Sequence, residues 1–174
     1  QKLIIRDGRI ENVMVYVRRG LKGWEMPPFE GEPVVLDQSG CQYRPHVVVV
    51  RVGQELLVRN SDPTTHNVNA EPRRNERFNK LQPKNRPDIE VDLERSEVGI
   101  PVGCDLHPWM GAVIHSLDHP FSALTAADGT FSISGLPPGD YSLRAVHETL
   151  GNKDAQLTVP ASGEAKVTFT YTAD

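Results

Sequence analysis

Short runs rich in valine, isoleucine, threonine, tyrosine and phenylalanine recur along the chain, and each is bounded by glycine, proline, asparagine or aspartate. Such runs are typical of β-strands separated by turns, and the apolar spacing of amphipathic helices is nearly absent. Many short strands with few helices favour packed sheets, so we expect an all-β protein. The expected strands are Asn12–Val17, Val34–Asp37, Tyr43–Val50, Glu55–Arg59, Ile89–Leu93, Gly99–Val102, Gly111–His115, Ser122–Thr125, Thr130–Ile133, Asp140–His147, Ala155–Val159 and Ala165–Tyr171.

Charge and hydropathy restrict the partners of the chain. Charged residues of both signs make up 24% of the 174 residues, and the formal net charge is −4. Nucleic acid requires a basic stripe, so we expect no nucleic-acid partner. The longest apolar run, Val47–Val50, is far shorter than the roughly 18 to 20 residues of a membrane span, so we expect no span. The oligomeric state cannot be inferred.

One loop between two β-rich runs carries three metal-binding side chains, Cys104, His107 and Met110, at Cys-x-x-His-x-x-Met spacing. Soft sulfur ligands select copper, and two histidines, one cysteine and a weak axial methionine form the blue-copper arrangement. The second histidine is His66, which follows the expected strand Glu55–Arg59. Loops at the same end of adjacent strands can meet in a Greek-key sandwich, so these ligands are expected to converge at one pole.

The residues from about Gly40 to His115 resemble those of the cupredoxin family, in particular its amicyanin- and plastocyanin-like members. The resemblance is carried by Tyr43-x-Pro45, Val52-Gly53-Gln54, Asn60, His66-Asn67-Val68 and the heptad Cys104–Met110. It implies a Greek-key cupredoxin β-sandwich that holds one copper ion. The implied equatorial ligands are His66, Cys104 and His107, and the implied axial ligand is Met110.

The same resemblance implies what lies around the copper and what the protein does. Asn67 would tie the two ligand loops together by hydrogen bonds, and Trp109 would either cover the copper or offer a docking face. The implied function is one-electron transfer to a redox partner protein in the periplasm or a secreted setting. The sequence has no G-x-S-x-G or H-E-x-x-H motif, so we expect a carrier and not an enzyme.

The chain changes character near Asp118. Asp128-Gly129 and Pro137–Asp140 are turn signals between β-rich runs, and the phrase DGTFSISGLPPGDYSL resembles the carboxypeptidase regulatory-like, or transthyretin-like, domain. This implies a second, smaller β-sandwich with a structural or interaction role. We therefore expect two domains, at residues 1–116 and 117–174. The second is short for that family, so a missing strand comes either from the N-terminal run Ile10–Arg18 or from the first domain.

The two cysteines, Cys41 and Cys104, leave three possibilities open: a single bridge, two free thiols, or metal ligands. A Cys41–Cys104 disulfide would remove the essential thiolate, and the alternative function is then a non-redox interaction or structural β-sandwich protein without functional copper. Otherwise Cys41 is an inert thiol or an additional ligand close to the copper.

The remaining polar segments are given mainly structural interpretations. The charged stretch Glu71–Glu97 is expected to be mostly a solvated surface excursion, with a docking surface for a redox partner as the alternative. His46 is expected to be a satisfied strand histidine, with a group beside Cys41 near the metal as the alternative. His115, His119 and His147 are expected to be structural or surface residues, although Asp118-His119 and His147-Glu148 together could form a weaker metal site.

Overall fold

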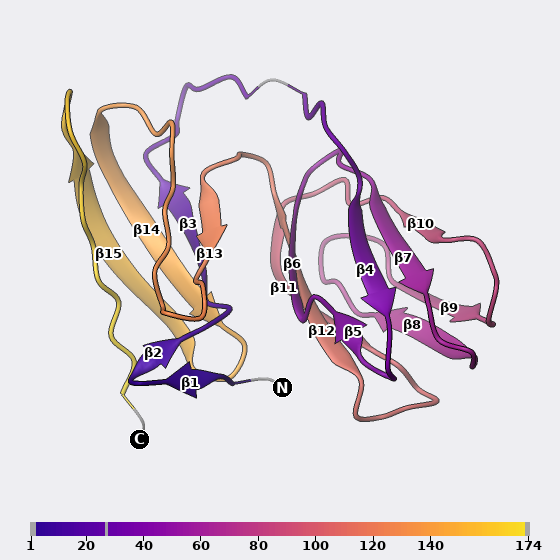
Figure 1. Cartoon of the computed structure of the whole chain (residues 1–174). Helices are drawn as coiled ribbons and strands as arrows, with labels where there is room; N and C mark the ends of the chain where they lie inside the picture. The colour runs from indigo at the N-terminus through magenta and orange to yellow at the C-terminus, as the bar shows by residue number, and fades with distance from the viewer. Residues whose placement is uncertain (1–2, 27, 173–174) are drawn as a thin grey trace. The chain divides into compact units, whose positions relative to one another are not determined.

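A computed structural model of the chain describes residues 3–26 and 28–172 (Figure 1). Every regular element assigned among these residues is a β-strand, so the expected all-β class is correct. The chain forms two compact units: residues 26–120 make up what we call the central unit, and the residues before and after it make up the terminal unit. The expected domains, 1–116 and 117–174, stay a prediction, but contacts group the N-terminal residues with the C-terminal part. The described residues contain no helix with the length and apolar character needed to span a membrane.

The central unit contains two mixed sheets, with strand orders β10-β7-β4-β5 and β6-β12-β11-β8-β9. β4 runs parallel to β7 and β6 runs parallel to β12, while the other neighbours are antiparallel. The strands are β4 (Val34–Gln38), β5 (Tyr43–Arg44), β6 (Val47–Arg51), β7 (Leu56–Asn60), β8 (His66–Ala70), β9 (Phe78–Gln82), β10 (Ile89–Val91), β11 (Glu97–Gly103) and β12 (Gly111–Leu117).

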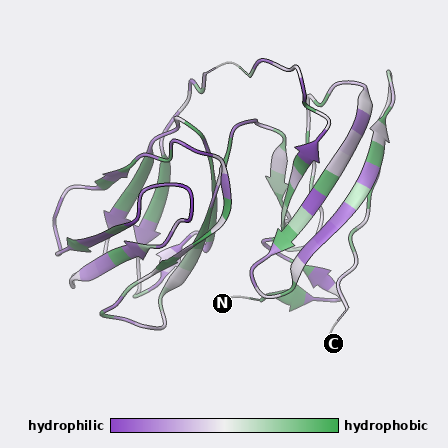
Figure 2. Cartoon of the chain, turned by 180° about the vertical axis from the view of Figure 1, so that it is seen from behind, coloured by the Kyte–Doolittle hydropathy of each residue, from purple (hydrophilic) through white to green (hydrophobic). Residues whose placement is uncertain are grey.

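One apolar core lies between these two sheets. Leu36 and Leu56 of one sheet and Ile100 and Ile114 of the other are buried in the same cluster. Burying each such side chain contributes about 1.5 to 3 kcal/mol. Hydrophobic and hydrophilic residues alternate along several strands (Figure 2), as expected where one face of a sheet is buried and the other is solvated.

Two expectations for the central unit need correction. The expected single strand Tyr43–Val50 is two strands in different sheets, β5 and β6, because the chain crosses between the sheets at Pro45, which has no N–H to donate to a ladder. The segment Glu71–Glu97 is not only a surface excursion, since it contains β9 as well as β10. β9 is an edge strand with mostly exposed side chains, so its sequence shows little apolar alternation.

The terminal unit is built on a four-stranded antiparallel sheet with the order β13-β3-β14-β15, accompanied by the hairpin β1-β2. β3 lies between β13 and β14, so the N-terminal run contributes a central strand to the C-terminal sheet. The strands are β1 (Ile5–Arg6), β2 (Arg9–Ile10), β3 (Met14–Arg19), β13 (Ser122–Leu124), β14 (Gly139–His147) and β15 (Gly151–Val159).

The expected strands Thr130–Ile133 and Ala165–Tyr171 are wrong, because the structure assigns no strand to either segment. Four of their side chains nevertheless pack on a small buried cluster formed by Val13, which precedes β3, Val15 of β3 and Ala145 of β14. These side chains are Phe131, Ile133, Phe169 and Tyr171. The two segments thus form a second layer without regular strand pairing. A groove of about 1130 Å³ that is partly open to solvent runs along this layer.

Candidate metal centre

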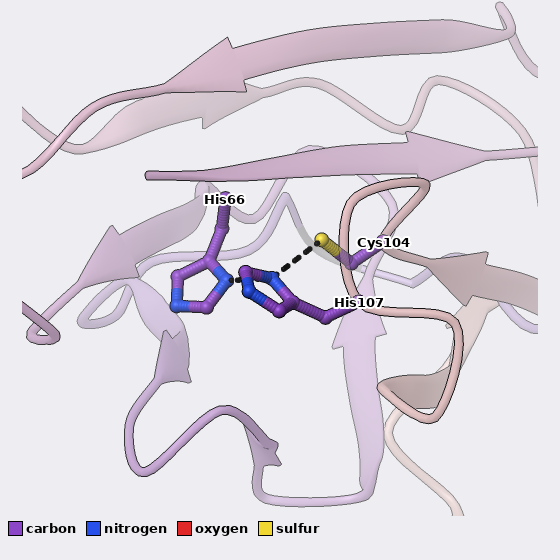
Figure 3. Close-up of side chains that lie close together, drawn as sticks. All are labelled: His66, Cys104 and His107. Carbon is purple, nitrogen blue, oxygen red and sulfur yellow. Dashed lines mark hydrogen bonds between the residues drawn. The ribbon is translucent and has the colours of Figure 1, made fainter. Parts of the chain in front are cut away.

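Three donor side chains converge at one end of the central unit (Figure 3). His66 is the first residue of β8, and Cys104 directly follows β11. One ligand atom each of His66, Cys104 and His107 lies within 4.8 Å of the others. His66 Nδ1 is 2.9 Å from His107 Nδ1, and Cys104 Sγ is 3.6 Å from His107 Nδ1. The three residues that the sequence singled out as equatorial ligands are therefore brought together.

The antiparallel pairing of β11 with β12 explains why Cys104 and His107 lie together. Gly103 pairs with Gly111, so residues 104–110 form the connecting loop. Within it the Met110 N–H donates to the His107 carbonyl at 2.9 Å and closes a turn. Pro108 fixes the backbone inside that turn. The loop is therefore short and internally bonded, and it holds both donors on one side.

The distances between the donors fit a transition-metal ion. Metal–sulfur bonds of about 2.3 Å and metal–nitrogen bonds of about 2.0 to 2.1 Å, as for zinc, place neighbouring ligand atoms about 3.4 to 3.6 Å apart in tetrahedral geometry. The Cys104 Sγ to His107 Nδ1 distance of 3.6 Å falls in this range. The His66 to His107 distance of 2.9 Å is shorter, so the two rings would separate by about half an ångström around an ion.

Asp62 sets the protonation pattern of His66. The Asp62 Oδ2 atom is 2.9 Å from His66 Nε2, and the exposed fractions of the two side chains are 10% and 0%. Burial by itself would raise the pKa of Asp62, but hydrogen bonds from the Cys41 and Gly40 amides and from His66 outweigh it and hold that pKa below its ordinary value. An ionised carboxylate only accepts, so Nε2 carries the proton and the Nδ1 lone pair faces His107.

Asn67 connects the two ligand loops. Its Oδ1 atom accepts hydrogen bonds from the Asp105 amide at 2.7 Å, the Leu106 amide at 3.3 Å and the Cys104 thiol at 3.3 Å. Its Nδ2 donates to Asp105 Oδ2 at 2.8 Å. One side chain at the start of β8 thus holds the first three residues of the cysteine loop, and its effect on a bound metal stays a prediction.

Met110 and Trp109 occupy different environments on the same loop. Met110 is 3% exposed and belongs to the core cluster that also contains Cys104. Trp109 is 69% exposed, its Nε1 donates to the Cys41 carbonyl at 3.1 Å, and its ring meets the His107 ring edge-on at 5.2 Å between centroids. Trp109 therefore flanks His107 at the surface, while the axial role of Met110 stays a prediction.

Cys41 and Cys104 are both free thiols, so the structure contradicts the alternative in which they form a disulfide. Cys41 is half-buried, and its ligand atom lies within 4.8 Å of those of Asp62 and His66. The sequence analysis missed Asp62, although its place four residues before His66 in a turn-forming Asn-Ser-Asp-Pro run was a usable signal.

The other histidines lie outside both groups of potential metal ligands found among residues 3–26 and 28–172. His46 Nδ1 is 3.0 Å from the Gly111 carbonyl. Burial lowers the pKa of His115 to about 4, and its neutral Nδ1 accepts the Gly99 N–H. His147 Nδ1 faces the amides of the turn after β14. The weaker site suggested for Asp118-His119 and His147-Glu148 is not among those groups.

Comparison with known proteins gives matches in structure only. No family model matches the chain, and no curated protein does. A Cu-containing nitrite reductase from Thermus scotoductus SA-01 matches with a TM-score of 0.44 and 18% identity. This match covers 51% of this chain but only 23% of the length of the nitrite reductase. The purple cupredoxin from Nitrosopumilus maritimus matches with a TM-score of 0.40 and 20% identity, and the match covers 48% of this chain and 98% of that protein. Amicyanin from Paracoccus versutus matches with a TM-score of 0.42 and 17% identity, and the match covers 59% of this chain and 96% of that protein.

Proposed function

We propose that the protein is a copper-binding cupredoxin that carries single electrons through one copper ion. The proposal rests on the convergence of a thiol and two imidazole nitrogens, from Cys104, His66 and His107, at one end of a β-sandwich. A thiolate with two imidazoles is the donor set that suits copper, and a weak axial thioether completes it, for which we propose Met110. When bound, copper supplies a Cu(II)/Cu(I) couple.

The surrounding residues hold the donors in place, which is what fast electron exchange requires. Asp62 orients the His66 ring through the contact at Nε2 and favours the tautomer whose Nδ1 lone pair faces the proposed copper site. Asn67 holds the cysteine loop through three hydrogen bonds to its oxygen. The Tyr43 hydroxyl lies 2.8 Å from the Asn67 carbonyl and 3.0 Å from the Gly103 carbonyl, so it links the backbones of β8 and β11 next to the ligands. Little motion is then needed when the charge of the centre changes.

We propose that electrons pass through the half-exposed face at His107. Two large apolar side chains on the same loop are exposed beside it, Leu106 at 52% and Trp109 at 69%. Apolar side chains around an otherwise polar surface suit brief docking of a redox partner protein. We propose that the protein is a carrier and not an enzyme, and that it is periplasmic or secreted. Fractionation of the native cell would test the location, and recovery in the cytoplasm would contradict it.

The decisive experiment is an absorption spectrum of the copper-loaded protein. We expect an intense thiolate-to-copper band in the visible range, which Cys104→Ala removes entirely. Cys41→Ala is the matched control and should keep the band, because Cys41 is not among the three converging donors His66, Cys104 and His107. An unchanged band in Cys104→Ala, or a loss of equal size in Cys41→Ala, would contradict the proposed site.

The axial role of Met110 has its own test. Met110→Leu preserves the volume of the buried side chain, so the fold and the visible band should both remain. The reduction potential should shift, because the axial ligand tunes it. Voltammetry of both proteins measures the shift, and an identical potential would exclude Met110 as a ligand.

A further inference from the structure

A second set of donors meets His66 through its other ring nitrogen. Asp62 Oδ2 lies 2.9 Å from His66 Nε2, whereas His107 lies at Nδ1. Ligand atoms of Cys41, Asp62 and His66 lie within 4.8 Å of one another. The fully buried imidazole therefore stands between two groups of metal-binding side chains, which we call the inner set (His66, Cys104, His107) and the outer set (Cys41, Asp62, His66).

We propose that the outer set is a second metal site, for an ion of the Zn²⁺ class. A thiolate, an imidazole and a carboxylate are all ligands that zinc uses, and three protein ligands leave one position for water or an exchanging ligand. An ion would take the place of the proton that Asp62 and His66 now share in their hydrogen bond. The inference does not depend on electron transfer at the inner set.

The turn before β5 preorganises this outer set. Gly40 N–H donates to Asp62 Oδ1 at 2.7 Å, and Cys41 N–H donates to Asp62 Oδ2 at 2.8 Å. Both residues have positive φ, 66° and 51°, so two consecutive amides point at one carboxylate. The same turn carries the thiol, which places it beside the carboxylate. Cysteine is uncommon at such a φ, where glycine, asparagine and aspartate are favoured, so the thiol occupies a position that the backbone alone does not favour.

The 2.9 Å contact between His66 Nδ1 and His107 Nδ1 lets either site use His66. With the ring proton on Nε2, Asp62 accepts it and the Nδ1 lone pair serves the inner set. With the proton on Nδ1, His107 accepts it and the Nε2 lone pair serves the outer set. A neutral imidazole has one such lone pair, so the two sites compete for His66. Cys41 is half-buried while Cys104 is 4% exposed, so the outer thiol is the more accessible to an ion from solvent.

Cobalt(II) is a suitable probe, because a Co²⁺–thiolate bond absorbs in the near ultraviolet and reports directly on sulfur ligation. In Cys104→Ala the inner thiolate is gone and the outer set is intact. We expect this variant to bind one equivalent of Co²⁺ with a thiolate band. The double variant Cys41→Ala/Cys104→Ala should lose the band and bind Co²⁺ at least about tenfold more weakly, since even outer contacts to a metal are worth that much.

Two outcomes would overturn the proposal: a folded Cys104→Ala protein without a thiolate band, or a band that survives in the double variant. Near-ultraviolet circular dichroism establishes folding, and Cys104→Ser serves as a second background if the alanine variant does not fold. Competition gives an independent readout, because copper bound at the inner set of the wild-type protein should weaken Co²⁺ binding at the outer set. Since Cys41→Ala alone leaves the inner thiolate in place, failure of the outer site and failure of the copper site are separable.

Discussion

The central and terminal units use similar strands but differ in how completely they are closed. In the central unit two sheets of paired strands enclose one core, and buried side chains from both sheets belong to a single cluster. In the terminal unit one paired sheet is covered by segments without strand pairing, beside a partly open groove of about 1130 Å³. Loops at the ends of paired strands are held by both sheets in the central unit, and this is where the donor side chains His66, Cys104 and His107 meet.

Core truncation should give the largest difference between the units. Leu56 is fully buried, so Leu56→Ala should destabilise the central unit by about 2 to 5 kcal/mol. Phe131 of the terminal unit is only half-buried, so Phe131→Ala should cost less because it removes less apolar surface from water-free packing. Hydrogen exchange resolved by segment measures each unit separately. Equal losses would show that the terminal unit is as tightly packed as the central one.

A smaller effect is expected at the polar end of the central unit, where Asn67→Ala removes the acceptor shared by the Cys104 thiol and two loop amides. Copper affinity should fall about 10- to 100-fold, as for other residues that orient metal ligands. Asn69→Ala is the matched control, since Asn69 donates to Asp105 Oδ1 but does not contact Cys104. Competition titration with a copper chelator measures both. Similar losses in the two variants would mean that Asn67 has no special role.

The sequence also predicted more of the central unit, above all its donor side chains, than of the terminal unit. The heptad Cys104–Met110 and His66 were identified because soft ligands at fixed spacing have few other uses. Asp62 was missed because a carboxylate in a turn is common, and only the fold shows that its oxygen faces His66. β9 was missed because an edge strand can be polar on both faces.

The errors in the terminal unit have a different cause. Phe131, Ile133, Phe169 and Tyr171 alternate with polar residues as in a strand, and burial alternates in the same way. Alternation reports which side chains face the core, whereas a strand also needs a neighbouring backbone at hydrogen-bonding distance. Pairing is a property of tertiary arrangement, so the pattern predicted the buried face correctly and the strand incorrectly.

The pH dependence of stability should also differ between the units, with a smaller effect than the loss of copper affinity expected for Asn67→Ala. Burial would raise the pKa of Glu97, but hydrogen bonds from the Arg73 and Arg74 amides and from Asn75 outweigh it and lower that pKa. A lowered carboxyl pKa contributes stability above its unfolded value of about 4.3, and this is lost as pH falls through the folded value. Glu97→Gln should therefore be less stable than wild type at pH 7, with the difference shrinking in acid. Urea midpoints across this range measure it.

The exposed Asp154 of the terminal unit is the control for this titration. Its pKa is lowered mainly by the hydrogen bond from Arg144, at the surface, where salt and water weaken the interaction. Asp154→Asn should change the pH dependence less than Glu97→Gln does. A constant difference between Glu97→Gln and wild type from pH 7 to pH 3 would contradict the assignment.

The smallest expected difference comes from removing one hydroxyl in each unit. Tyr43 is 4% exposed, and its hydroxyl proton is shared between the Asn67 and Gly103 carbonyls at 2.8 and 3.0 Å. Tyr43→Phe should destabilise the central unit by about 1 kcal/mol, because two carbonyls beside the ligand loops lose their donor. Tyr141 donates to the part-buried Pro137 carbonyl at 3.0 Å, a single carbonyl four residues away in a turn, so Tyr141→Phe should cost the terminal unit less. If Tyr141→Phe costs as much, the hydrogen bonds beside the ligand loops add no more rigidity than those of an ordinary loop. The proposal that these bonds hold the donor side chains still during electron exchange would then lose its structural basis.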